Sequence, residues 1–593
     1  MSLFGMEIGK RAIAAQQIAL EVTGHNISNT NTPGYTRQIP NLVTTIPYHT
    51  PTLTNNTKVG QLGTGVTVAD IERIRDAFLD QQIRNEAKTS GYWSSMQNAL
   101  AQVEVILNEP STDGLRSVMD MYWESWQDLV SHPESEAVRT TVAERGMALA
   151  DGFNHMHKQL TELREDLNAS VKIKVDEINT ITSQLADLNV QILSIKIAGK
   201  QPNDLEDKRD MLLDQLSQIV DIKTFTDSNG MIAVQLGGRA LVQGTDNTVL
   251  ATETDTKGMY LVTWEDTKAR AQIESGELRG FLDARGRTEL DKEKESPGKP
   301  SEYKEVVPNL LNNLNNLAKT IITKTNELHR GGYSLNNKGI YPDGKNFFEE
   351  VNTGDVEWAA ILKVEEDILN NPINIAVAKA PTFNNEGEKA NFGDARIAME
   401  IANLKHNFNN SEWRVKLPNW TGLLSGVLPV DINPSFDISG TTVNVDATVS
   451  NMSELAAAIQ AAIDDAGLEI KVRLEGSDIN MISNTIFTVD WSGNYEATEH
   501  KGAISSATVD DYWRSVCANV GVKSQEAIRM TTNQEVLLSE LEGKRQSISG
   551  VSLDEELINM IKFQHAYNAA SRFITTIDEA IDVIVNRMGI VGR

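Results

Sequence analysis

The chain of 593 residues contains a single cysteine, Cys517. One thiol cannot form an intramolecular disulfide or a zinc site built on cysteines, so the sequence excludes both. A run of about 18 consecutive apolar residues, the length that a bilayer-spanning helix requires, does not occur either. We therefore expect no membrane-spanning segment.

Positive charge is also in short supply: 55 Lys and Arg residues face 82 Asp and Glu residues, and the formal net charge is −27. Because phosphate groups are bound through basic faces, this balance argues against nucleic acid or a membrane as a partner. Glu7, Lys10 and Arg11 interrupt the apolar positions near the N-terminus. A secretory signal has an uninterrupted apolar stretch there, so this segment is not predicted to be one.

Motifs of common enzymes are missing as well. The chain contains no HExxH, no Walker loop and no GxSxG element. His155 and His157 are two residues apart and would point to different faces of a helix, so they cannot chelate a metal together. We interpret Cys517 as a buried structural thiol. No catalytic residue, no metal site and no cofactor is predicted.

The sequence does contain enough apolar material for several cores. Apolar residues make up 40% and charged residues 23% of the chain, and these are ordinary values for a soluble globular protein. At roughly 150 residues per domain, the length suggests three or four domains.

The first 22 residues follow a heptad pattern. Apolar residues occupy the a and d positions, with Arg11 as the exception. The predicted N-terminal seam consists of Phe4, Ile8, Ala15, Ile18 and Val22. Ala12, Ala14 and Ala19 add helix propensity and a thin profile for close approach. We expect the helix to end near Gly24, since glycine readily takes the left-handed conformation of a helix C-terminus.

A longer amphipathic helix is predicted at the other end of the chain, over residues 553–588. Ser552 and Glu555 form a capping-box pattern at its start, and Gly589 follows its last turn. From residue 560 onward its a and d positions are apolar without interruption. The predicted C-terminal seam consists of Met560, Phe563, Tyr567, Ala570, Ile574, Ile577, Ile581, Ile584 and Met588.

A helix cannot shield such a stripe alone, so each seam needs a partner helix. Two interpretations are open: ordinary packing of two helices inside a globular domain, or burial between copies in an assembly. The position of both seams at the extreme ends of the chain favours the assembly, because a lone chain would expose the pair as a protruding rod.

The segment after the N-terminal helix carries a more specific signature. It reads Gly24-His25-Asn26-Ile27-Ser28-Asn29-Thr30-Asn31-Thr32-Pro33-Gly34-Tyr35-Thr36-Arg37-Gln38. Asn and Ser side chains bond nearby backbone groups, and Pro followed by Gly fixes a tight turn. This turn after an alanine-rich helix resembles the N-terminal signature of flagellar axial proteins, the rod, hook and hook-associated proteins. The matching positions are Asn26, Asn29, Pro33, Gly34 and Tyr35, whereas His25 stands where the family commonly has a second asparagine.

The C-terminal segment resembles the second signature of the same proteins. Its matching parts are Ser552-Leu553-Asp554-Glu555-Glu556, residues 563–567 and residues 574–578. Three interior segments, 32–38, 202–210 and 326–348, are more similar to the hook–filament junction family than to the hook protein. The resemblance covers residues 1 to about 405 and about 508 to 593.

Membership of that family would imply a structural subunit that self-assembles at the junction between hook and filament. It would imply export through the flagellar type III apparatus to a secreted, extracellular position, with a cytoplasmic export chaperone covering the C-terminal seam beforehand. The expected partners are further copies in a ring-like layer, the hook protein, and a second hook-associated protein on the filament side.

We predict a multidomain, mainly α fold with β-rich parts. A terminal coiled-coil domain combines residues 1–50 with 550–593. A helical body with long helices combines residues 60–408 with 508–549. Residues 409–507 interrupt the helical pattern and are interpreted as an inserted α+β domain, with strands near 441–445 and 469–474.

Within the body, apolar residues spaced three and four apart predict a long helix over 160–195. Further helices are predicted near 70–107 and 113–131. Asn203 with Glu206 is the pattern of a capped helix start. Short apolar runs between turns predict a β subdomain between about 221 and 285.

Three other functions fit parts of the pattern. The chain could be another flagellar axial protein, such as a hook subunit. The inserted domain could carry an enzyme acting on surface glycans, which would need paired carboxylates in a cleft. The coiled-coil ends could also belong to an adhesin or scaffold unrelated to flagella.

Overall fold

The computed structural model describes most of the chain. The described residues are 2–47, 63–109, 111, 114–289, 304–338, 341–350, 356–384, 387–406, 411–417, 430–432, 435–439, 441–449, 452–468, 470–475, 478–483, 488–490, 494–496, 498–501 and 508–583. The chain divides into two compact units. The first comprises residues 1–99, 165–305 and 524–593, and the second comprises residues 100–164 and 306–523.

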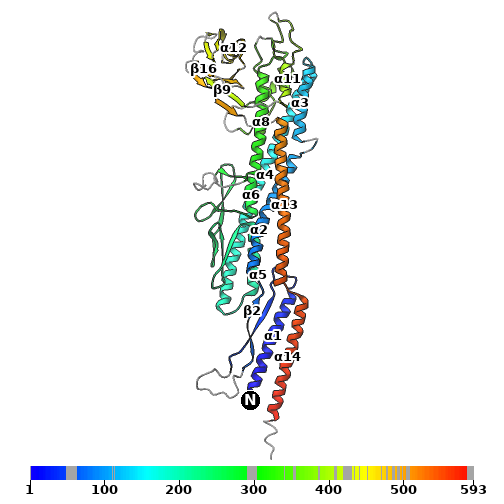
Figure 1. Cartoon of the computed structure of the whole chain (residues 1–593), viewed down its shortest axis with the longest axis vertical. Helices are drawn as coiled ribbons and strands as arrows, with labels where there is room; N and C mark the ends of the chain where they lie inside the picture. Colours follow the sequence, from blue (N-terminus) through cyan, green and yellow to red (C-terminus); the bar gives the residue numbers. More distant parts are fainter. Residues whose placement is uncertain are drawn as a thin grey trace, which may run out of the picture. The chain divides into compact units, whose positions relative to one another are not determined.

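Helices dominate the first unit, and three of them continue into the second (Figure 1). The continuing helices are α2 (Ala77–Leu107), α4 (Glu136–Ile197) and α13 (Val509–Ser549). The first unit also contains α1 (Ser2–Ser28), α5 (Asn203–Ile219), α6 (Glu277–Arg285) and α14 (Leu553–Asp582). The prediction of a mainly α fold with β-rich parts is confirmed.

The core of the first unit lies between α4, α5 and six short strands. The strands form an antiparallel sheet of β3 (Ile222–Thr226), β4 (Ile232–Leu236), β5 (Arg239–Gln243) and β6 (Asp246–Asn247), and a hairpin of β7 (Leu250–Thr254) and β8 (Tyr260–Trp264). Buried residues of α4 at helical spacing, including Val171, Val175 and Ile178, pack in one cluster with Val234 and Val262 from the strands. The stripe predicted over 160–195 is therefore the core-facing side of α4.

The predicted β region needs one correction, because residues 277–285 at its end form the helix α6. This helix contributes Leu278 and Leu282 to the same core. Glu277, Leu278, Phe281, Leu282 and Arg285 follow helical spacing, and the prediction of β structure up to residue 285 overlooked that spacing.

The start of α5 also differs from its prediction. Asn203 is the first helical residue, and no side chain caps the helix. The side-chain amide of Asn203 instead donates to the Ile71 carbonyl over 2.8 Å and to Gln38 Oε1 over 3.2 Å. Glu206 forms ion pairs with Arg73 and Lys196, each at 2.8 Å. Tertiary contacts therefore use both side chains that the capping pattern had assigned to the helix start.

A two-stranded antiparallel hairpin precedes α2. It consists of β1 (Gln38–Thr44) and β2 (Val66–Arg73), with a register shift between Asn41 and Leu42. The helix predicted near 70–107 thus begins only at Ala77. Asp76 accepts a hydrogen bond from the Phe78 backbone N–H over 2.9 Å, which marks the helix start.

The second unit contains α3 (Leu115–Ser131), close to its predicted range, and α8 (Val306–Arg330). Shorter elements follow: α9 (Trp358–Ile361), α10 (Glu366–Asn370), the 3-10 helix η1 (Pro372–Asn374) and α11 (Arg396–Asn403). The α3 side chains Tyr122 and Trp126 are fully buried and make ring contacts with Phe347.

Two buried polar residues of α8 hold the irregular chain that follows it. The Asn326 amide donates to the Phe348 carbonyl over 2.8 Å, and its oxygen accepts from the Phe347 and Phe348 N–H groups. His329 Nδ1 lies 2.8 Å from the Lys345 carbonyl, and its Nε2 accepts from the Ala376 N–H over 2.9 Å. These bonds fix the neutral Nδ1–H tautomer. Complete burial lowers the pKa of His329 to about 4.

The described residues between 411 and 501 form strands around one helix. The elements are β9 (Ser411–Leu417), β10 (Val430–Ile432), β11 (Ser435–Ile438), β12 (Thr441–Asn444), β13 (Ala447–Val449), α12 (Met452–Asp465), β14 (Lys471–Glu475), β15 (Asp478–Ser483), β16 (Thr488–Asp490), β17 (Asn494–Glu496) and β18 (Thr498–Lys501). Two antiparallel sheets have the strand orders β12-β11-β16-β17 and β14-β15-β9-β18. Leu455, Ile459 and Ile463 of α12 form a core with residues of these strands. The α+β character predicted for this segment matches these elements.

Candidate assembly site at the chain termini

The two ends of the chain pack against each other as an antiparallel pair of helices, α1 and α14 (Figure 1). Gly5 lies beside Ile577, Gly9 lies beside Ile574, and Asn26 lies beside Glu556. A Cβ atom at Gly5 would come within 2.7 Å of Ile577, and one at Gly9 within 2.5 Å of Ile574. The glycines therefore allow a closer approach of the helices than any side chain would permit.

The predicted C-terminal seam faces α1 but is only partly covered. Its described members are all half-buried: Met560, Phe563, Tyr567, Ala570, Ile574, Ile577 and Ile581. Ile584 and Met588 lie outside the described residues. Glu556 is the one fully buried residue among those described for α14. One neighbouring helix therefore does not cover this seam.

The predicted N-terminal seam is divided between two environments. Ala15 and Val22 are buried, and Phe4 and Ile8 are half-buried. Ile18 is 36% exposed within the chain, so α14 does not cover it, and its place in the assembly seam stays a prediction. Ala19 is buried instead, with 0% exposure. The buried positions Ala15, Ala19, Val22 and Asn26 lie four, three and four residues apart, which is still a heptad spacing.

Several large apolar side chains of α14 and of the residue that follows it stay largely exposed within the described part of the chain. The exposed residues are Leu553, Leu557, Ile558, Ile561, Phe573 and Val583. The helix is therefore apolar on more than the side that faces α1. Such a surface in a protein marks an interaction site.

The signature turn begins later than predicted, because α1 continues through Gly24 to Ser28. The buried Asn26 side chain makes four hydrogen bonds. Its amide donates to the Gln38 carbonyl over 2.8 Å and to Glu556 over 3.1 Å. Its oxygen accepts from the Gln38 N–H over 3.0 Å and from the Tyr35 hydroxyl over 2.8 Å. Asn26 thus ties α1, β1 and α14 together from a position inside the helix.

The remaining signature residues shape the turn itself. Asn29 donates to the His25 carbonyl over 3.0 Å, and its oxygen accepts from the Thr32 hydroxyl over 3.1 Å. Pro33 and Gly34 follow, and Gly34 has a φ of 79°, which favours glycine. The Tyr35 hydroxyl also lies 3.0 Å from His25 Nδ1. Burial, together with nearby carboxylates such as Asp204, raises the pKa of Tyr35 above its ordinary value.

Arg37 anchors α14 electrostatically. Its guanidinium lies 2.8 Å from Glu556 and 2.6 Å from Glu555, in the first turn of the helix. The backbone N–H of Arg37 donates to the Ser549 carbonyl over 2.9 Å. Ser552 caps α14 and accepts from the Glu555 N–H, as predicted. The carboxylates in the first turn of α14 are therefore stabilised twice, by the positive end of the helix dipole and by the Arg37 guanidinium.

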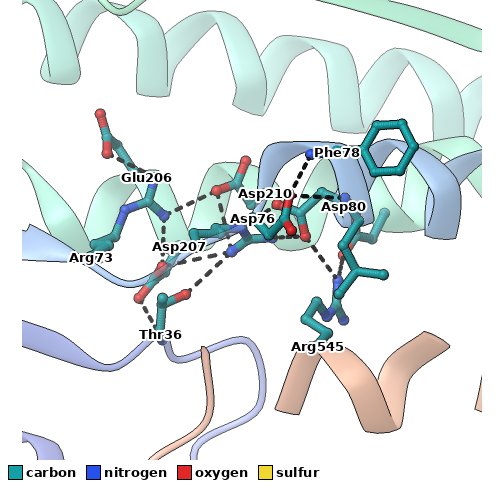
Figure 2. Close-up of polar contacts among 12 residues, drawn as sticks. Thr36, Arg73, Asp76, Phe78, Asp80, Glu206, Asp207, Asp210 and Arg545 are labelled. Carbon is teal, nitrogen blue, oxygen red and sulfur yellow. Dashed lines mark hydrogen bonds and ion pairs between the residues drawn. The ribbon is translucent and has the colours of Figure 1, made fainter. Parts of the chain in front are cut away.

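A buried ionic cluster lies next to this anchor (Figure 2). Asp207 accepts from the Thr36 N–H over 2.9 Å and pairs with Arg73 at 2.7 Å. Asp210 lies within ion-pair distance of Arg73, Arg75 and Arg84. Burial raises the pKa of Asp210, but the guanidinium groups, with Arg75 first, outweigh it and hold the pKa below its ordinary value.

The same cluster reaches the end of α13. Arg545 lies 2.6 Å from Asp214 and 3.8 Å from Asp80, and Asp80 pairs with Arg75 at 2.6 Å. Segments 36–38, 73–84, 204–214 and 545–556 thus meet at one place. Sequence reasoning missed the cluster, although the spacing of Asp207, Asp210 and Asp214 places three carboxylates on one face of a helix.

An open cleft of about 1080 Å³ lies between the signature turn, α2, α5 and the end of α13. The charged residues in its wall already pair within the chain, among them Arg75, Asp214 and Arg545.

The one cysteine, Cys517, is half-buried, whereas the sequence predicted a buried thiol. Burial raises the pKa of this thiol to about 12. Its thiolate is therefore scarce near neutral pH.

Comparisons with known proteins point in one direction. Residues 100–348 match the model of the flagellar hook-associated protein FlgK helical domain. Residues 6–36 match the flagella basal body rod protein, and residues 544–588 match the C-terminal model of the flagellar basal body rod FlgEFG proteins. The chain is 30% identical to flagellar hook-associated protein 1 of Bacillus subtilis, over 100% of this chain and 99% of the relative. The chain belongs to the flagellar hook-associated protein 1 family.

Other members of the flagellar hook-associated protein 1 family are more distant. The protein of Escherichia coli is 25% identical, over 96% of this chain and 97% of its own. A solved structure, that of the flagellar hook junction protein FlgK from Burkholderia pseudomallei, aligns with a TM-score of 0.47 and 16% identity, over 79% of this chain and 100% of that chain.

Membership of the flagellar hook-associated protein 1 family makes this chain a structural component of the flagellum, associated with other axial proteins. The resemblance of both terminal segments to axial proteins is confirmed. None of the helices in the described ranges combines the length and apolar character needed to cross a membrane.

Proposed function

We propose that this flagellar hook-associated protein joins hook and filament by self-assembly of its terminal helices, and that the seams on α1 and α14 carry that assembly. The observation that supports the proposal most directly is the half-burial of the described C-terminal seam, from Met560 to Ile581. The apolar effect is worth about 25 cal/mol for each Å² removed from water, so neighbouring copies that cover α14 stabilise the assembled state.

The partners follow from this role. Copies of the chain form a ring-like layer that contacts the hook protein on one side and a second hook-associated protein on the other. An export chaperone covers the C-terminal seam before type III secretion to the cell exterior. The role that we propose is structural and not enzymatic.

The seam is tested by Ile577→Asp, which introduces a charge beside Gly5. We expect the amount of chain incorporated into isolated hook–filament structures to fall to background, because an unpaired charge in an apolar contact is strongly unfavourable. Quantitative blotting of purified flagella measures incorporation. Ile528→Asp, at an exposed position of α13, is the matched control and should incorporate normally. Normal incorporation of Ile577→Asp would refute the proposal.

We further propose the three-part organisation of terminal coiled-coil domain, helical body and inserted domain 409–507. The separate core formed by Leu455, Ile459 and Ile463 with the surrounding strands supports an inserted domain. Replacing residues 409–507 by a short Gly/Ser linker should leave incorporation within about twofold of wild type, since surface insertions close at a small entropic cost. Loss of incorporation by a variant whose helix content in circular dichroism is retained would contradict this division.

A further inference from the structure

The terminal region of the first unit has three layers. α1 packs against the β1–β2 hairpin and also against α14. α14 packs chiefly against α1 and has no comparable contact with either strand. The outer side of α14 and the outer side of the hairpin are therefore separate surfaces, with α1 between them.

The outer side of α14 is apolar and basic. At 100° per residue, Ile558 and Ile561 lie on the side opposite Phe563 and Ile574. Lys562 lies between the two sides and is exposed, with its ammonium 5.9 Å from the centroid of the Phe563 ring. Ile558 is 66% exposed and Ile561 54% exposed. Residues 557–573 contain no Asp or Glu in a chain of net charge −27, but they include Lys562, His565 and Arg572. This exposed surface, formed by Ile558, Ile561 and Lys562, is called the α14 outer face.

The outer side of the hairpin is apolar and acidic. Ile39 and Glu72 are cross-strand neighbours and both are exposed. Val43 is also exposed and lies opposite Thr67. Arg73 is the only cation of β2, and it forms ion pairs with Glu206, Asp207 and Asp210. Its charge is therefore already balanced within the chain. This surface, formed by Ile39, Val43 and Glu72, is called the hairpin outer face.

The hairpin is poorly suited to pairing with a further strand. Pro40 in β1 has no N–H, and the register shifts between Asn41 and Leu42. Both features are found on strands that resist edge pairing. A partner therefore meets the exposed side chains of this hairpin and not its backbone edge.

We propose that the α14 outer face of one copy packs against the hairpin outer face of the next copy. The two faces match in apolar character and are opposite in charge, and they belong to the same chain but do not meet within it. A contact between two different faces of identical subunits repeats from copy to copy and builds rings or helical layers. The inference rests on the proposed self-assembly and names the surfaces that meet.

Charge reversal tests the pairing. Lys562→Glu and Glu72→Lys each place like charges opposite one another, so each should lower incorporation into hook–filament structures about tenfold. The double variant restores opposite charges at every contact and should recover wild-type incorporation. The matched controls are Lys544→Glu and Glu535→Lys, at exposed positions of α13, which should have no effect.

Cysteine cross-linking provides a second measurement. In a Cys517→Ser background, two copies carrying Ile39→Cys and Ile558→Cys are produced together, and isolated flagella are oxidised. A disulfide-linked dimer is expected only from the mixture.

The outcomes separate the two proposals. Normal incorporation of both charge variants, or no cross-linked dimer from assembled flagella, would overturn this pairing, while loss of incorporation by Ile577→Asp would still support assembly through the seam. If Ile577→Asp also incorporates normally, the proposed function itself falls.

Discussion

Asp210→Ala should lower the free energy of unfolding of the first unit by about 3–5 kcal/mol. The Asp210 side chain is 9% exposed and lies within 3.0 to 3.4 Å of Arg73, Arg75 and Arg84. Its removal leaves three guanidinium groups in a buried site with fewer negative partners. The cost arises from those uncompensated charges and not from the loss of a favourable ion pair alone, because replacing both partners of a buried pair is often neutral.

Amide hydrogen exchange of purified protein measures this effect locally, in the peptides that cover α5 and β2. Asp187→Ala on the exposed side of α4 is the matched control and should change the free energy by less than about 0.5 kcal/mol. If the two variants are equally stable, the cluster contributes nothing and its buried geometry is wrong.

Acidification should destabilise the second unit through His329 alone by about 3 kcal/mol between pH 6.5 and pH 4. The folded pKa of about 4 lies below the ordinary value of 6.5, so the unfolded chain binds a proton first as the pH falls. The stabilising effect is complete above pH 6.5 and is lost progressively down to about pH 4. The structural cause is that Nε2 accepts from the Ala376 N–H, so a protonated ring would direct a donor at a donor.

The measurement is chemical denaturation at several pH values, monitored by amide hydrogen exchange in the peptides around residues 326–348. His329→Gln should be less stable than wild type at pH 7 and should lose most of the pH dependence in this range. The exposed His155 serves as control, and His155→Gln should keep the wild-type pH dependence. If the free energy of unfolding of His329→Gln depends on pH as steeply as that of wild type, His329 is not the cause of the pH dependence.

Local rules predicted the regular parts of this fold well. The stripe over 160–195 and the uninterrupted seam from Met560 specify helices because each position is apolar at helical spacing. The Ser552 cap was predicted for the same reason, since its partner Glu555 is three residues away. In these elements the decisive contacts are close in the sequence.

The misses share a different cause. Gly24 does not end α1, because Asn26 two residues later bonds to Gln38 and to Glu556, which stabilises a further turn of helix. Asn203 does not cap α5, because Pro202 holds the N-cap position and the Asn203 side chain, inside the first turn, donates to Ile71 and Gln38. Contacts between residues far apart in the chain override the local pattern at both places.

The candidate site was predictable in outline only. The sequence indicated which side of α14 faces a partner, but the roles of Gly5 and Gly9 depend on Ile574 and Ile577 at the other end of the chain. The ionic cluster joins segments more than a hundred residues apart, so its acidic half could be seen on α5 while its arginine partners could not.

The bond between Asn26 and Glu556 spans 530 residues, and this separation sets an order of events during synthesis. A ribosome adding 5–20 residues per second needs roughly half a minute to two minutes to produce Glu556 after Asn26. Asn26 therefore lacks one of its hydrogen-bond partners until Glu556 has been synthesised. A chain released too early would lack this closure, so only full-length product can present properly joined ends.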